Sequence, residues 1–163
     1  EALRLMDLDA KATGLKCLQG LIWRSGFESG ELRAHVYDDV PPALETWQDA
    51  GLDLRVYSSG SIEAQKLFFG HTIHGNLLPR FSAHYDTTIG SKKDARSYRR
   101  IVEDIGMGAE QILFLSDVPA ELDAAREAGL CAALARRPEN ADVESAGHAE
   151  FASFSEILMT AAD

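Results

Sequence analysis

The chain has 163 residues, 45% of them hydrophobic, and carries a formal net charge of −10 at pH 7. This length favours a single domain, and the apolar fraction is enough for an ordinary hydrophobic core. The acidic excess argues against a general binder of nucleic acids or anionic membranes, because both carry negative charge themselves. The sequence shows no apolar run of membrane length and no secretion signal, so we expect a cytoplasmic protein. Cys17 and Cys131 lie in apolar patterns without metal-ligand spacing, and we predict that both are buried free thiols.

The first part of the chain, residues 1–29, is predicted to be helical and to differ in character from the later residues. Leu15, Leu18 and Ile22 recur on one helical face, and the pattern ends at Gly26. The periodicity indicates an amphipathic helix that packs against another part of the protein.

A second helix is predicted after Pro41, because proline is favoured in the first turn of a helix. Leu44 and Trp47 form its expected buried face, and Gly51 is expected to end it. Asp39 stands where a helix cap is expected.

The next stretch, residues 54–66, reads LRVYSSGSIEAQK and combines a short strand, a polar turn and the start of a helix. Ser58 and Ser59 follow the strand, and Gly60 lets the backbone approach a ligand closely. Hydroxyls together with the outward-pointing first amides of a helix are typical of an anion site. The alternative is that Ser59 or Ser61 only caps the helix, which explains less well why two adjacent serines precede the glycine.

The rest of the chain alternates strands with helices. Strands are predicted at residues 52–57, 81–85, 112–115 and 130–135, and helices at residues 61–70, after Ser91 and after Pro119. A capping box of Ser91 and Asp94 is expected to open the helix that buries Tyr98. The wholly apolar run 112–115 is predicted to be a fully buried strand. This alternation predicts a parallel α/β sheet, in which functional groups gather beyond the carboxyl ends of the strands.

Polar side chains come after three of these strands. Ser58 and Ser59 end one strand, Lys92 lies in the connection after another, and Asp117 follows a third. These groups suit a phosphate ester with Mg²⁺: the serines and amides hold oxygens, the ammonium neutralises charge, and the carboxylate binds the metal. Taken singly, Lys92 would be a surface lysine, Asp117 a helix cap and Glu121 a first-turn acid favoured by the helix dipole. Their joint occurrence in this order favours the phosphate site.

The segments that carry these groups read VYSSGSIEAQKLFFGH, FSAHYDTTIGSK, YRRI and ILFLSDVPAELDAAREAG. Their order resembles motifs II, III and IV of the haloacid dehalogenase superfamily. The match extends to one family within it, the enolase-phosphatases, also called acireductone synthases. LKCLQGLIW and SGELRAHVYDDVPPAL are similar to that family's segment between cap and core.

The resemblance implies a Rossmann-like parallel sheet of the haloacid dehalogenase type with the remnant of a helical cap. Residues 1–29 would be the C-terminal part of that cap, and residues 30–163 the α/β core. It further implies a Mg²⁺-dependent reaction of methionine salvage, in which 2,3-diketo-5-methylthiopentyl 1-phosphate is enolised and then dephosphorylated. The expected partner is therefore a small phosphorylated molecule, and the expected full-length protein is a cytoplasmic monomer.

The resemblance also assigns site residues. The family's phosphate-binding roles fall on Ser58, Ser59 and Lys92, and Lys92 is the expected catalytic residue among them. The family's metal ligand falls on Asp117, and Glu121 occupies the second acidic position of the fourth motif.

One motif of the family, Asp-X-Glu-Gly-Thr, does not occur in this sequence. Its aspartate is the family's nucleophile, and a covalent aspartyl-phosphate splits the difficult step into two easier ones. We therefore expect a chain truncated at its N-terminus, inactive alone, that lacks the first strand and leaves a gap in the sheet.

Three alternatives remain at this point. Asp7 and Asp9 imitate a first motif of the Asp-X-Asp kind, although Ala10 and Lys11 replace the expected Gly-Thr. The second alternative is a non-catalytic relative that keeps a phosphate pocket for binding. The third is a generic phosphatase of the same superfamily that acts on small phosphoesters.

Overall fold

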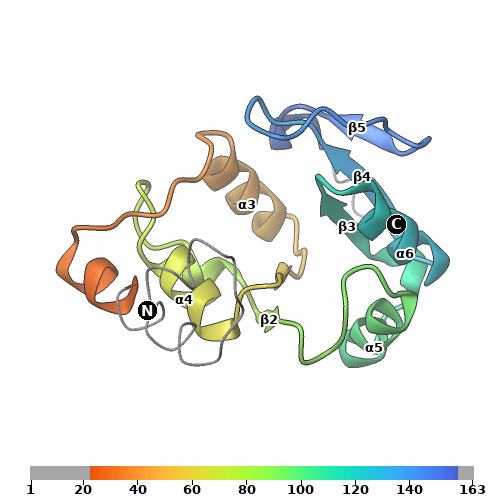
Figure 1. Ribbon diagram of the computed structural model, residues 1–163, viewed down its shortest axis with the longest axis horizontal. Coiled ribbons are helices and arrows are strands. Elements are labelled where there is room, and N and C mark those ends of the chain that lie inside the picture. Colours follow the sequence, from red (N-terminus) through yellow and green to blue (C-terminus); the bar gives the residue numbers. More distant parts are fainter. Residues whose placement is uncertain (1–22, 158–163) are drawn as a thin grey trace, which may run out of the picture.

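The computed structural model describes residues 23–157 of the chain (Figure 1). The main helices are α3 (Val40–Asp49), α4 (Ile62–Gly70), α5 (Ala95–Ile105) and α6 (Pro119–Glu127). The strands are β1 (Arg55–Tyr57), β2 (Ala83–Tyr85), β3 (Leu113–Ser116), β4 (Cys131–Ala135) and β5 (Ala149–Phe151). Short 3₁₀ turns cover Leu78–Arg80, Ala109–Gln111 and Phe154–Glu156, and residues 23–29 are also helical. No helix in the described part is long and apolar enough to cross a membrane.

The strands form two parallel sheets. One pairs β1 with β2, and the other has the order β3-β4-β5. The predicted parallel α/β arrangement is confirmed, because every strand pair is parallel and helices connect β1 to β2, β2 to β3 and β3 to β4. Within residues 23–157, no strand pairs with the second edge of β1 or of β3.

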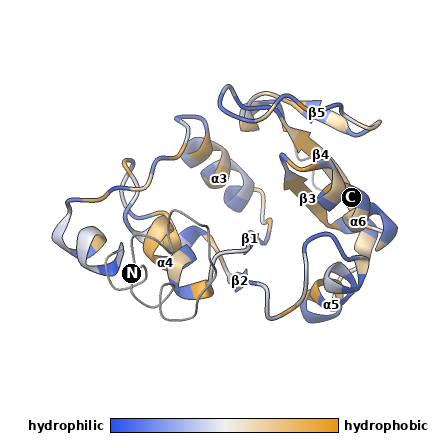
Figure 2. Cartoon of the chain, viewed as in Figure 1, coloured by the Kyte–Doolittle hydropathy of each residue, from blue (hydrophilic) through white to orange (hydrophobic). Residues whose placement is uncertain are grey.

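Helices cover both faces of β3. Adjacent residues of a strand point to opposite sides of the sheet, so Phe114 and Leu115 pack against different helices. Leu115 packs against a buried cluster that includes Leu44 and Trp47 of α3. Phe114 packs against a second cluster, which contains Tyr98 of α5 and Ala125 of α6. The apolar colouring of β3 and β4 between α3 and α6 agrees with this arrangement (Figure 2).

Two burial predictions are wrong. Every residue of β3 keeps partial exposure, because in the described part of the chain only β4 covers an edge of this strand. Cys131 is exposed at the start of β4, where its thiol lies 3.4 Å from the carbonyl of Glu110. Cys17 lies outside the described residues.

The helix ends obey local signals in the sequence. Ser61 caps α4 by accepting a hydrogen bond from the Ala64 amide at 3.2 Å. Gly106 ends α5 in the left-handed conformation, with φ of 75°. The start of α5 differs from the prediction, because Asp94 and not Ser91 is its cap. The Ser91 carbonyl accepts hydrogen bonds from the Asp94 amide and the Ser97 hydroxyl, which closes a separate turn before the helix begins.

Asp39 connects α3 to distant parts of the chain and does not cap the helix with its side chain. Its carboxylate accepts hydrogen bonds from Arg137 at 2.8 Å, the Ser153 hydroxyl at 2.8 Å and the Phe154 amide at 2.6 Å. Burial alone would raise the pKa of Asp39, but these hydrogen bonds outweigh it and lower the pKa below its usual value. Asp39 therefore anchors the loop after β4, which carries Arg137.

Asp39→Asn is expected to lower the free energy of unfolding at pH 7 by about 1–3 kcal/mol, because a buried cation loses its charged partner. The folded-state pKa of Asp39 lies below the unfolded-state pKa of about 3.9, so the ionised carboxylate stabilises the fold at any pH above about 3.9. This stabilisation is lost as the pH falls through the lower, folded-state pKa. Urea unfolding at pH 7 and at successively lower pH checks this, and the difference from the unaltered chain should shrink below about pH 4. The control is Asp38→Asn, since the Asp38 side chain is 97% exposed. An equal loss in both variants, or a loss independent of pH, contradicts the assignment.

Candidate active site

The first part of the site is the turn at residues 58–61, at the carboxyl end of β1. The Gly60 amide donates a hydrogen bond to the Ser58 hydroxyl oxygen at 3.2 Å, and the Ser58 amide donates to the end of β2 at 3.1 Å. Ser59 is exposed. The capping alternative is thus correct for Ser61, whereas Ser58 and Ser59 remain available to donate their hydroxyl protons to an anion.

Gln65 supports this turn, a role that the sequence patterns did not indicate. The residue is only 5% exposed. The Gln65 amide group donates to the Gly60 carbonyl at 2.9 Å and to the carbonyl at the end of β2 at 2.9 Å. Because both amide protons are engaged, the Gln65 oxygen is an acceptor, so the His84 nitrogen Nδ1, 3.1 Å away, carries a proton.

The second part of the site joins Lys92 to Glu121. The Lys92 Nζ atom lies 2.6 Å from Glu121 Oε2, and the Ser116 hydroxyl donates to the same oxygen at 2.8 Å. The Glu121 side chain is 9% exposed and that of Lys92 is 23% exposed. A carboxylate buried this deeply needs a cationic partner and further hydrogen bonds, and the fold supplies both. Glu121 therefore holds the Lys92 ammonium near the end of β3.

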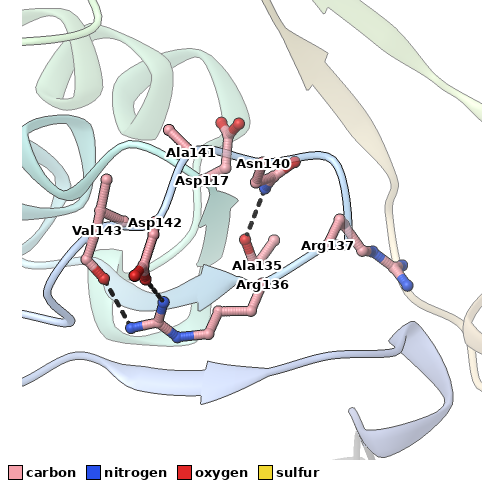
Figure 3. Close-up of a pocket in the computed structure, with 8 residues that line it drawn as sticks. All are labelled: Asp117, Ala135, Arg136, Arg137, Asn140, Ala141, Asp142 and Val143. Atoms are coloured by element: carbon pink, nitrogen blue, oxygen red, sulfur yellow. Dashed lines mark hydrogen bonds and ion pairs between the residues drawn. The ribbon is translucent and has the colours of Figure 1, made fainter.

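Asp117 comes directly after Ser116 and is exposed. The cap position of α6 is Val118 and carries no side-chain hydrogen bond, so the capping alternative for Asp117 is wrong. Asp117 lines a pocket of about 130 Å³ together with the loop after β4. Arg136 reaches Asp142 and the Val143 carbonyl in this loop, at 3.5 and 2.8 Å (Figure 3).

The chemistry of these groups can be compared with the requirements of Mg²⁺. This ion keeps several water ligands and is usually bound through one or two carboxylates plus substrate phosphate oxygens. Within residues 23–157, no group of three or more His, Cys, Asp or Glu side chains is placed to hold a metal. In the same range, no donor hydrogen-bonds to the Asp117 carboxylate. The residues present thus fit a single carboxylate ligand for an ion held mainly by phosphate and water.

The fold brings Lys92 and Glu121 into contact, and Ser116, which hydrogen-bonds to Glu121, directly precedes Asp117 in the chain. Across the part of the chain that the structure describes, no hydrogen bond or ion pair joins Ser58 or Ser59 to these residues. The predicted Asp7 and Asp9 alternative falls outside the described residues.

A family model described as haloacid dehalogenase-like hydrolase matches residues 14–129. The chain belongs to this family. Relatives named enolase-phosphatase E1 include one from Drosophila yakuba, 52% identical over 147 residues, and one from Gluconobacter oxydans, 53% identical over 142 residues. These matches cover 90% and 87% of this chain. The resemblance to enolase-phosphatases that the sequence segments indicated is confirmed.

The chain spans 57% of the length of the Drosophila relative and 63% of that of the bacterial one. Among solved structures, the UTR4 protein of Saccharomyces cerevisiae is 36% identical and has a TM-score of 0.88, over 96% of this chain and 72% of the yeast chain. A haloacid dehalogenase-type phosphatase from Thermococcus onnurineus is 22% identical, with a TM-score of 0.64 over 75% of this chain and 56% of its own. The second likeness shows the fold alone, and both agree with a Rossmann-like sheet of the haloacid dehalogenase type.

Proposed function

We propose that this chain forms the phosphate-binding and metal-binding part of a Mg²⁺-dependent phosphatase of the enolase-phosphatase kind. The observation that carries the proposal is the contact of Lys92, Glu121 and Ser116 at the end of β3, with Asp117 as the next residue of the chain after Ser116. The names of the relatives at 52% and 53% identity support the same chemistry.

Each residue has a separate role in this proposal. The Lys92 ammonium neutralises charge on the phosphoryl oxygens, and Ser58 and Ser59 donate hydroxyl hydrogen bonds to them. Glu121 positions Lys92 and does not itself meet the substrate, because its oxygen is already shared by Lys92 and Ser116. Asp117 would be the protein ligand of Mg²⁺, which polarises phosphoryl oxygens when it is bound.

The proposed substrate is 2,3-diketo-5-methylthiopentyl 1-phosphate of methionine salvage, converted by enolisation and dephosphorylation in the cytoplasm by a monomer. Residues 1–29 would belong to the helical cap and residues 30–163 to the core. Since the sequence contains no Asp-X-Glu-Gly-Thr, we propose that these 163 residues alone bind phosphate but do not transfer it.

Calorimetric titration with inorganic phosphate, with and without Mg²⁺, tests the proposal on the chain itself. Phosphate and Mg²⁺ should strengthen each other's binding, since each supplies ligands or charge to the other. Ser58→Ala should weaken phosphate binding by about fivefold, the effect of one hydrogen bond. Ser61→Ala is the matched control: it removes a helix cap and lowers stability by about 1 kcal/mol, but should leave phosphate affinity unchanged.

No phosphate binding by the unaltered chain contradicts the proposed site. Binding without phosphate release, even when the nucleophile motif is supplied by a second protein segment, favours the non-catalytic relative. Release by the 163 residues alone that disappears in Asp7→Asn would transfer the nucleophile role to the N-terminal Asp-X-Asp.

A further inference from the structure

Residues 89–92, in the connection between β2 and α5 (Figure 1), are held in an unusual way. Each of their carbonyls accepts a side-chain hydrogen bond, although the segment belongs to no helix or strand. Arg100 donates to the Ile89 carbonyl at 3.0 Å, Tyr57 to Gly90 at 3.0 Å, Ser97 to Ser91 at 2.8 Å and Tyr98 to Lys92 at 2.7 Å. We call this segment, residues 89–92, the strap. Lys92, which reaches Glu121, is its last residue.

Two of the strap's donors are buried, and the donors come from two different elements. Tyr98 is 0% exposed and Ser97 is 2% exposed, both on α5, whereas the half-buried Tyr57 is the last residue of β1. A hydroxyl buried this deeply is costly unless it is hydrogen-bonded, so the strap carbonyls and these donors depend on one another. The carbonyls of a loop ordinarily accept hydrogen bonds from water. Hydrogen bonds from buried side chains instead indicate that the position of this segment is important.

Gly90 makes the close approach of the strap possible. Its φ is +139°, which is outside the range that other residues adopt readily. A Cβ atom at this position would lie 2.2 Å from the Ser97 hydroxyl oxygen. The strap can therefore lie against α5 only with glycine at this point.

One aromatic cluster joins the three elements that carry the candidate site. The rings of Tyr57 and Tyr98 meet edge to face at 5.6 Å, and those of Tyr98 and Phe114 at 5.0 Å. Tyr57 directly precedes Ser58, Tyr98 holds the backbone of Lys92, and Phe114 lies three residues before Asp117 on β3. The positions of the serine turn, the lysine and the aspartate are thus set by the same three rings.

We propose that Tyr98 and Tyr57 are positioning residues, which place Lys92 for contact with phosphate by holding the strap carbonyls. The inference rests on the proposed function, because it concerns the lysine assigned there to the phosphoryl oxygens. Burial and the nearby Glu121 carboxylate raise the pKa of both tyrosines, so they remain hydroxyl donors over the working pH range.

The test compares Tyr98→Phe and Tyr57→Phe with Tyr85→Phe as the matched control. The Tyr85 side chain is also buried, and its hydroxyl is bound to Arg55 and Asp104 at 2.5 and 2.6 Å, away from the strap. All three variants keep the ring and lose one hydroxyl, so urea unfolding should show similar losses of stability. In Tyr98→Phe and Tyr57→Phe the lost hydroxyl holds the strap, whereas in Tyr85→Phe it does not.

Two readouts separate positioning from a general loss of stability. The first is exchange of the Lys92 ammonium protons with water by ¹⁵N NMR, which reports its pairing with Glu121 and needs no ligand. The second is the affinity for inorganic phosphate. Tyr98→Phe should speed the exchange about tenfold and weaken phosphate binding about tenfold, the equivalent of one buried hydrogen bond. Tyr57→Phe should have a smaller effect in the same direction. Tyr85→Phe should leave both within about twofold.

The inference is overturned if the strap variants lose stability as Tyr85→Phe does but keep ammonium exchange and phosphate affinity unchanged. Should Tyr98→Phe fail to fold, Ser97→Ala takes its place, because it removes another hydroxyl that donates to a strap carbonyl. If the unaltered chain binds no phosphate, the proposed function fails, and the ammonium exchange alone decides whether the strap positions Lys92.

Discussion

Asp117→Asn is expected to remove most of the Mg²⁺-dependent phosphate release from an enzyme built on this chain. The neutral amide is a poorer ligand for a hard cation than the carboxylate it replaces. Since Asp117 is exposed and no donor among residues 23–157 hydrogen-bonds to its carboxylate, the substitution should leave the fold and its stability nearly unchanged. The loss of activity can therefore be assigned to the metal site.

The measurement needs the nucleophile that we propose Asp-X-Glu-Gly-Thr supplies. A hybrid protein supplies it by joining this chain to a segment that contains Asp-X-Glu-Gly-Thr. Steady-state phosphate release is measured over a range of Mg²⁺ concentrations in the hybrid and its variants. The control is Asp142→Asn, because Asp142 lines the same pocket but is paired with Arg136. Full activity in Asp117→Asn would exclude the metal role, and an equal loss in Asp142→Asn would assign the effect to the pocket in general.

Local signals in the sequence were enough to predict most elements of the fold. Ser61, Gly106 and Pro119 act within one or two turns of their own helix, so their effects do not depend on distant residues. The same reasoning predicted Lys92 in the connection after one strand and Asp117 just past the end of another, because polar groups gather beyond the carboxyl ends of the strands in a parallel sheet.

Interactions that depend on tertiary position were not predicted. Asp39 occupies a capping position, but its carboxylate is bound by Arg137 and Phe154, which are about a hundred residues away in sequence. Gln65 holds the turn at residues 58–61 by donating to a carbonyl five residues before it, which no periodic pattern indicates. Both cases involve backbone carbonyls or amides as partners, and these are present at every position and leave no trace in the sequence.

The start of α5 shows how a local prediction fails. Ser91 and Asp94 are both suitable caps, and a capping box counted from Ser91 is reasonable by sequence alone. The Ser91 carbonyl, however, is held by Ser97, so the backbone at Ser91 belongs to the strap and the helix begins only after Asp94. The constraint comes from the side-chain hydrogen bonds that hold the strap and not from helix propensity.

Lys92→Ala is expected to reduce turnover of the same hybrid enzyme by about 10²-fold or more, because the charge that stabilises the transferring phosphoryl group is lost. The substitution also leaves the Glu121 carboxylate, whose side chain is 9% exposed, without its cation. Breaking such a pair should lower the free energy of unfolding by about 3 kcal/mol, so the single variant combines a catalytic and a structural loss.

The double variant Lys92→Ala with Glu121→Gln separates these two losses. Removing the carboxylate charge should restore most of the stability, since the neutral amide can still accept the Ser116 hydrogen bond without a cation beside it. Turnover should stay low, because the ammonium is still missing. Lys93→Ala is the matched control, as Lys93 is the adjacent exposed lysine. Turnover is measured with urea unfolding on the same samples, and recovery of turnover in the double variant would show that Lys92 only neutralises Glu121 and does not act on phosphate.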